Sequence, residues 1–240
     1  VDTVLMGAVL SVFTLFDLSA VALLLVAWQG IGFLVEHSSA ARPSTSRLVA
    51  RYRREWMANH VTREPRVFDA MVLSSLRQGT SFFASACMIA IGGGLALLGN
   101  TERLESVATD LTAPGAPQLV WELKILLVIL ITVAAFLAFV WSHRLFGYCA
   151  VVMSSVPNDP ADPTVYPRAA KAAELNVNAA RSYNRGLRSI YFAMTALAWF
   201  LGPVALVIAT SVTFVVLWRR EFASRSRATL MQDDAPRDPG

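Results

Sequence analysis

Four long apolar runs constrain the fold of this chain more than any other feature. They cover approximately residues 4–35, 82–99, 119–141 and 190–218. A helix of about 20 apolar residues crosses the hydrocarbon layer of a bilayer. These runs are continuously apolar, whereas the strands of a membrane barrel alternate. The sequence therefore predicts an all-α fold, an integral membrane four-helix bundle.

The composition supports a membrane protein and argues against other classes. Hydrophobic residues make up 55% of the 240 residues and charged residues 16%, whereas soluble chains average about 25% charged residues. This excludes a soluble domain, a disordered tail and a disulfide scaffold as the main class. The formal net charge of +4 does not indicate nucleic-acid binding, because the basic residues are segregated by loop. Cys87 and Cys149 both lie in apolar runs, so we expect buried core residues.

The segments that join the apolar runs differ in their content of lysine and arginine. Segment 36–80 carries eight basic residues and segment 143–188 carries six, whereas segment 100–118 carries only Arg103. Cytoplasmic loops of membrane proteins are enriched in these residues. We therefore expect both long segments in the cytoplasm, with helices extending into it, and the N-terminus outside. The first run is too long for a signal peptide and lacks its basic start, so it is predicted to remain as the first span.

The favoured arrangement is a single membrane domain of four spans, residues 1–222, followed by a flexible tail, residues 223–240. Four spans return the C-terminus to the outside. Trp218 would then lie at the outer interface together with Trp121, as aromatic belts do. Pro203 is expected to kink the long fourth span near its middle.

An alternative arrangement keeps the C-terminal tail inside. The tail is basic from Arg219 and Arg220 onward, which conflicts with an outside location. Residues 190–218 would instead form a re-entrant hairpin around Gly202-Pro203. Each arm would have about 14 residues, too few to cross the bilayer, so the four-span arrangement is preferred.

The first cytoplasmic segment contains a predicted basic amphipathic helix from Arg47 to His60, preceded by capping serine and threonine residues. The residues assigned to lipid or partner binding are Arg47, Arg51, Arg54 and Trp56. Two interpretations remain open. The helix lies on the inner leaflet, with its arginines on anionic lipid headgroups, or it packs on a second helix that begins after Pro65 and forms a cytoplasmic stalk.

Several short motifs resemble a known family. They are Arg53-Arg54-Glu55-Trp56-Met57, Ser81-Phe82-Phe83-Ala84-Ser85, Ile91-Gly92-Gly93-Gly94-Leu95, Trp121-Glu122-Leu123-Lys124, Tyr148-Cys149, Tyr183-Asn184-Arg185-Gly186-Leu187-Arg188, Trp199-Phe200-Leu201 and Arg219-Arg220-Glu221-Phe222. Together they resemble the bacterial branch of the membrane-protein family catalogued as domain of unknown function 599, over nearly the whole chain. The resemblance implies a four-span protein of the bacterial inner membrane and no known activity. Where family members often have Arg-Gln-Phe-Asn before Tyr-Cys, this chain has Arg144-Leu145-Phe146-Gly147, so no polar role is placed there.

Asp17 is the strongest candidate for a functional polar site. It is a carboxylate within an apolar span, where a charge costs a few kcal/mol and usually faces a partner or a water path. A proton or cation site is one interpretation. The other is that Asp17 lies near the outer interface or bonds a neighbouring helix. A proton relay generally needs several such groups, and the spans contain one.

The histidines do not indicate a metal site. His37 and His143 lie at the cytoplasmic ends of the first and third runs, a suitable position for metal or haem. Neither has a second ligand at helical spacing, and no Cys-x-x-Cys-His or His-Glu-x-x-His motif is present. We therefore predict no metal and no cofactor, and we expect His60 to face solvent.

Glu122 and Lys124 are predicted to anchor the third span at the interface.

Small residues repeat along the second span. Ala86, Ala90, Gly93 and Gly94 form a small-x-x-x-small pattern. Such a pattern lets the backbone of a neighbouring helix approach closely. We assign these four residues to helix packing, within one chain in preference to between two copies.

No arrangement of Ser, His, Cys or paired carboxylates indicates catalysis, so the protein is predicted not to be an enzyme. The favoured function is that of a structural, assembly or accessory scaffold component of a membrane complex. The alternative is a small transporter or ion channel that uses Asp17. The expected partners are the lipid bilayer, including anionic lipids, and further copies of the chain or a larger membrane complex, with no nucleic acid.

Overall fold

The computed structural model describes residues 13–99 and 118–232. Its α-helices are α2 (Leu15–Glu36), α3 (Thr45–His60), α4 (Val67–Leu98), α6 (Gln118–Ser154), α7 (Val165–Ala196), α8 (Pro203–Phe222) and α9 (Arg225–Leu230), with a 3-10 helix η1 (Leu197–Leu201) between α7 and α8. The described ranges contain no strand. The predicted all-α fold is confirmed.

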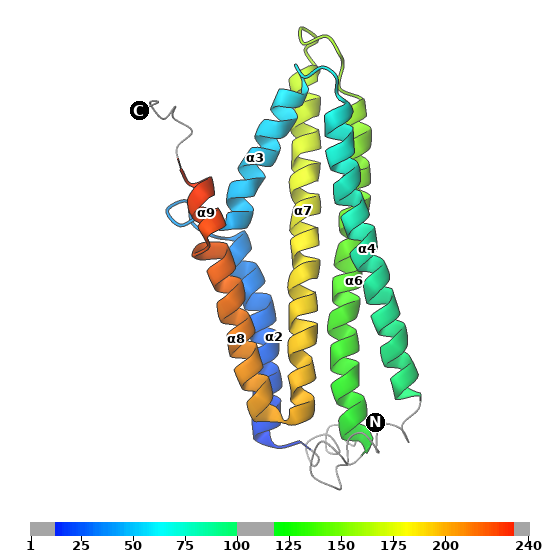
Figure 1. Ribbon diagram of the computed structural model, residues 1–240, viewed down its shortest axis with the longest axis vertical. Coiled ribbons are helices and arrows are strands. Elements are labelled where there is room, and N and C mark those ends of the chain that lie inside the picture. Colours follow the sequence, from blue (N-terminus) through cyan, green and yellow to red (C-terminus); the bar gives the residue numbers. More distant parts are fainter. Residues whose placement is uncertain (1–12, 100–117, 233–240) are drawn as a thin grey trace.

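The long helices lie side by side in an elongated bundle (Figure 1). α8 packs on α2 at one edge, α7 packs along α6 in the centre, and α4 packs on α6 at the other edge. α3 lies alongside the half of α7 that is remote from α8. Among the described residues, four segments are long and apolar enough to cross a membrane: Leu15–Glu36, Val67–Leu98, Gln118–Ser154 and Pro203–Leu230.

The segment expected to be the fourth span is not one helix. α7 ends at Ala196, η1 follows, and the chain reverses at Gly202 before α8 begins at Pro203. Gly202 has φ +111°, a left-handed conformation that glycine adopts without steric cost. Proline fits the first turn of a helix because its missing N–H has no intrahelical partner there. Pro203 therefore starts a new helix, and the prediction of a kinked single helix over 190–218 is wrong.

The reversal brings the end of α8 to the end of α2. The Thr45 hydroxyl donates to the carbonyl oxygen of Glu221 at 3.0 Å, whereas the indole of Trp199 in η1 donates to Asp17 at the opposite end of α2, at 3.1 Å. Trp218 therefore lies far from Trp121, and the prediction that they share an interface is wrong. The hairpin alternative describes this reversal better than the single fourth span does. Its second arm, α8, is longer than the expected length of about 14 residues, because it has 20.

Part of the tail predicted to be flexible is ordered. Residues Arg225–Leu230 form α9, whose N-cap Ser224 accepts from the backbone N–H of Arg227 at 3.1 Å. The Arg227 guanidinium in turn donates to the carbonyl of Pro43 at 2.8 Å. The beginning of the tail is thus attached to the connection between α2 and α3.

The predicted cytoplasmic helices are confirmed as helices. α3 begins after Ser44, whose hydroxyl accepts from the N–H of Arg47 and caps the helix. α3 and α4 are joined by a buried polar cluster around Asp69, whose carboxylate is 0% exposed. It accepts from the Trp56 indole at 2.6 Å, from His60 Nδ1 at 2.8 Å and from Arg63. The expectation that His60 faces solvent is wrong, since it is only 2% exposed.

The small residues of the second span do not all pack against a helix. A Cβ at Gly94 would lie 2.8 Å from Cγ1 of Ile129 on α6, whereas nothing lies within 4 Å of a Cβ at Gly93. Ala86, Ala90 and Gly93 are exposed on α4. Among the described residues, Gly94 is the one of the four at a close helix contact, so the preferred packing within one chain is not found for the other three.

Candidate functional site: a basic cavity

A polar cavity of about 710 Å³ lies where α2 and α8 end. The first half of α3 and the middle of α7 complete its wall. We call it the basic cavity. Its charged lining residues are five arginines and two glutamates: Arg47, Arg53, Arg54, Arg181, Arg188, Glu36 and Glu221.

The turn from α2 to α3 shapes one side of the basic cavity. The hydroxyl of Ser44 donates to the carbonyl of Val35 at 3.0 Å, and the N–H of Ser44 donates to the hydroxyl of Ser38 at 3.1 Å. These bonds satisfy polar groups at the end of α2 and at the start of α3. They place the first turn of α3 beside the last turn of α2.

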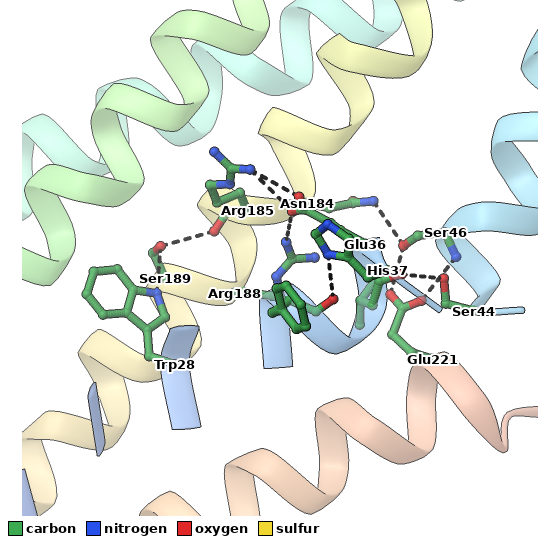
Figure 2. A network of polar contacts seen from close by, with 12 residues as sticks. Trp28, Glu36, His37, Ser44, Ser46, Asn184, Arg185, Arg188, Ser189 and Glu221 are labelled. Carbon is green, nitrogen blue, oxygen red and sulfur yellow. Dashed lines mark hydrogen bonds and ion pairs between the residues drawn. The ribbon is translucent and has the colours of Figure 1, made fainter. Parts of the chain in front are cut away.

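Glu221 connects α8 to the start of α3. Its carboxylate accepts from the N–H of Ser46 at 3.0 Å and from the Ser46 hydroxyl at 2.9 Å (Figure 2). A carboxylate is favourable at a helix N-terminus, because the free N–H groups there carry partial positive charge. The side-chain amide of Asn184 donates to the same hydroxyl at 3.4 Å, which adds α7 to the connection.

Glu36 connects α2 to α7. Its carboxylate forms ion pairs with Arg188 at 2.9 Å and with Arg185 at 3.2 Å (Figure 2). The Arg188 guanidinium lies beside Gly32, one turn before Glu36, where a Cβ would be 3.7 Å from Nη2. The small residue leaves room for the buried arginine to extend along α2 toward Glu36.

Two neighbouring arginines of α3 face α7. Arg54 forms an ion pair with Glu174, and this hydrogen bond lowers the pKa of the Glu174 carboxyl below its ordinary value. Arg53 donates to the side-chain oxygen of Asn176. Its Nε is buried and has no hydrogen-bond partner, and burial lowers the pKa of its guanidinium. Arg53 is therefore a partly buried cation whose hydrogen-bonding capacity is only partly used.

The four residues assigned to lipid or partner binding separate in the structure. Arg47 and Arg54 line the basic cavity. Arg51 lies outside the lining and pairs with Glu55 at 3.4 Å on the exposed side of α3. Trp56 donates to Asp69 of α4. These contacts with α4 and α7 agree with the stalk interpretation of α3.

Asp17 lies at the opposite end of α2 from the basic cavity. Its carboxylate accepts from the N–H and hydroxyl of Thr14, at 3.2 and 2.6 Å, while the Thr14 hydroxyl accepts from the N–H of Asp17 at 3.1 Å. This reciprocal pair is a capping box. The remaining oxygen accepts from Trp199. The visible contacts of Asp17 are those of a residue that starts a helix and attaches it to η1.

The other polar residues considered from the sequence contact side chains nearby in the structure. Lys124 is buried, with its ammonium 4.9 Å from the ring centre of Trp121. His143 lies 3.2 Å from the Thr80 hydroxyl of α4, and His37 stacks on Phe33 at 4.2 Å. Within the described ranges, no group of three His, Cys, Asp or Glu residues could hold a metal ion.

Sequence reasoning missed the residues that close the basic cavity. Glu36, Arg188 and Glu221 are far apart in the chain, and the family motifs that contain Arg188 and Glu221 give these residues no role. A weak signal exists, since each is a charged residue within three positions of the end of an apolar run. Such a charge usually has a partner, but the sequence does not say which.

Comparison with known proteins shows the family. The family model described as "Protein of unknown function, DUF599" matches residues 19–226. No curated protein and no solved structure matches the chain. The matched range includes α3, α4, α6, α7 and α8 in full and every charged residue of the basic cavity. This membrane protein therefore belongs to the DUF599 family.

Proposed function

We propose that the protein is a structural, assembly or accessory component of a complex in the bacterial inner membrane. The supporting observation is the interior of the bundle around α2 and α8. It is filled by fully buried apolar side chains, among them Leu24, Ile31, Phe192 and Leu206. An ion or solute pathway needs polar groups through the membrane. A packed apolar interior favours a supporting component over a conduit.

The transporter alternative depends on Asp17. Both of its carboxylate oxygens accept hydrogen bonds, from Thr14 and from Trp199. These contacts account for a carboxylate at this position by helix capping and attachment of α2 to η1. Helix capping is therefore sufficient to explain the residue, and the accessory role is preferred.

The proposed orientation has five crossings, and the end of α7 together with η1 is the additional one. The apolar run alone gave this arm about 14 residues, too few for a crossing, but the arm begins earlier. Arg185 pairs with Glu36 at one end of α2, the Trp28 indole donates to Ser189 at 3.1 Å, and Trp199 donates to Asp17 at the other end, so this stretch follows α2 along its length. Arg188 sits inside this part and extends to Glu36, as long basic side chains do at membrane boundaries. With the N-terminus outside, five crossings leave the basic residues that follow α8 in the cytoplasm. This arrangement places every strongly basic segment inside and leaves Arg103 in the outer segment, as the positive-inside rule favours.

This topology predicts the location of reporter fusions. A reporter fused after Phe222 or after Leu230 is expected in the cytoplasm, and one inserted between α4 and α6 outside. The measurement is a pair of enzyme reporters, one active only inside and one only outside. A fusion after Ala196 should lie on the outer side and serves as the control for the α7 crossing. An outside signal from the Leu230 fusion would contradict five crossings.

The accessory role predicts a complex. After purification from its source membrane in mild detergent, native mass measurement is expected to show an assembly heavier than one 26.1 kDa chain. It should contain further copies or a second protein at a fixed ratio. A single chain that carries only lipid would contradict the role.

A transport assay separates the two functions. Liposomes with an internal pH-sensitive dye and an imposed potential would contain either the unchanged protein or Asp17→Asn. Asparagine retains an oxygen that accepts a hydrogen bond but does not titrate. We expect no flux from either protein. Proton flux that disappears in Asp17→Asn would overturn the accessory role in favour of transport.

A further inference from the structure

The basic cavity has more positive charge than its own carboxylates balance. Glu36 is paired with Arg185 and Arg188, and Arg54 is paired with Glu174. The other three lining arginines, Arg47, Arg53 and Arg181, form no ion pair among the described residues. Each donates to a neutral oxygen instead, on Ser38, Asn176 and Asn178 respectively.

Arg53 carries the clearest sign of an unused binding capacity. It lines the cavity, and its Nε is buried without a hydrogen-bond partner. An unpaired donor of this kind is costly when buried. The planar guanidinium matches the geometry of phosphate and carboxylate oxygens. An anion in the cavity would balance the charge of the three arginines.

An apolar groove of about 570 Å³ runs between α2 and α8. Its wall includes Leu23, Val26, Gly30 and Phe33 of α2 and Phe214 and Val215 of α8. Both helices belong to the segments that are apolar enough to cross a membrane. The groove therefore lies at the depth of lipid acyl chains.

The basic cavity and the groove adjoin at the last turn of α2. Phe33 lines the groove and His37 lines the cavity. The two rings stack with their centres 4.2 Å apart. α8 passes both as well, since Val215 lines the groove and Glu221 the cavity. A cationic recess at the end of an apolar groove matches a molecule with an anionic head and a hydrocarbon chain.

We infer that the basic cavity binds the phosphate headgroup of an anionic phospholipid whose acyl chain lies in the α2–α8 groove. Arg47, Arg53 and Arg181 supply the positive charge that holds the phosphate. The volume of the cavity is within the range of about 300–1,000 Å³ that small-molecule sites have. A soluble phosphate compound would use the same arginines but not the groove. This site is independent of whether the protein has partners.

Native mass measurement of lipid binding tests the inference. The purified protein in mild detergent is titrated with phosphatidylglycerol, with phosphatidylcholine of the same acyl chains, and with glycerol 3-phosphate as the soluble probe. We expect phosphatidylglycerol to bind tighter than either of the other two. Arg53→Gln removes one charged donor and should weaken phosphatidylglycerol binding about tenfold.

Matched variants separate the cavity from general charge effects. Arg51→Gln changes the charge of the same helix by the same amount, but Arg51 lies outside the cavity, so binding should be unchanged. Arg181 also lines the cavity and is exposed, so Arg181→Gln should fold and should also weaken phosphatidylglycerol binding. This variant tests the cavity even where Arg53→Gln does not fold. For the groove, Gly30→Phe should weaken phosphatidylglycerol and leave glycerol 3-phosphate unaffected. Gly92→Phe is its control, because Gly92 is exposed and nothing lies within 4 Å of a Cβ there.

Three results would overturn the inference. One is equal binding of phosphatidylglycerol and phosphatidylcholine. Another is an equal loss of binding in Arg51→Gln and the cavity variants, which would indicate attraction to the whole basic surface. The third is glycerol 3-phosphate binding as tight as that of the lipid, with no effect of Gly30→Phe on either. That outcome would assign the cavity to a soluble phosphate compound.

Discussion

Replacement of Gly186 by alanine is expected to destabilise the protein by about 1–3 kcal/mol, the usual cost of overpacking a core. A Cβ at Gly186 on α7 would lie 2.8 Å from the Cε1 and Cζ atoms of Phe139 on α6. This separation is shorter than any ordinary carbon contact. Gly186→Leu should prevent the two helices from packing and abolish the folded state.

Phe139 has little freedom to move away from an added side chain. Its ring is 0% exposed, stacks on Phe83 with centres 5.3 Å apart, and meets Tyr183 edge-on at 5.5 Å. The measurement is thermal unfolding in detergent, followed by circular dichroism. Gly147→Ala on α6 is the control: nothing lies within 4 Å of its Cβ, and a helical glycine replaced by alanine gains about 0.5–1 kcal/mol. Equal stability of both alanine variants would contradict the close contact.

Replacement of Asp69 by alanine is expected to lower the free energy of unfolding by about 3–5 kcal/mol, the cost of removing one partner of a buried ion pair. The change leaves the Trp56 indole, His60 Nδ1 and the Arg63 guanidinium without their acceptor. Because these three donors join the end of α3 to the start of α4, we also expect the α3–α4 connection to become sensitive to proteases. Thermal unfolding and limited proteolysis measure the two effects.

Glu55→Ala provides the matched control for Asp69→Ala. Glu55 is also a carboxylate paired with an arginine, Arg51, but both side chains are largely exposed. Exposed pairs four residues apart on a helix contribute about 0.3–0.5 kcal/mol. Asp69→Asn keeps one acceptor oxygen and should fall between the two. If Asp69→Ala lowers the free energy of unfolding no more than Glu55→Ala does, the buried cluster contributes little to stability.

The sequence by itself determined the class of fold and most of the helices. The apolar runs predict membrane-crossing helices because their length and uniformity are local properties, and the described parts of the first three runs lie largely in α2, α4 and α6. The start of α3 was predictable for the same reason. A capping serine acts on the N–H three residues later, so Ser44 and Arg47 carry the signal within one turn.

Only the tertiary structure decided the direction of the last helix and the composition of the basic cavity. The sequence at Gly202-Pro203 permits a kink or a reversal of the chain. Which of the two forms depends on the helix against which α8 packs. That helix is α2, almost 200 residues earlier in the chain. The partner of Glu36, Arg188, is 152 positions away. Local pattern does not encode such pairs, because they depend on which helices become neighbours and at what depth. The same applies to Gly186, whose importance comes from the ring of Phe139 on the adjacent helix.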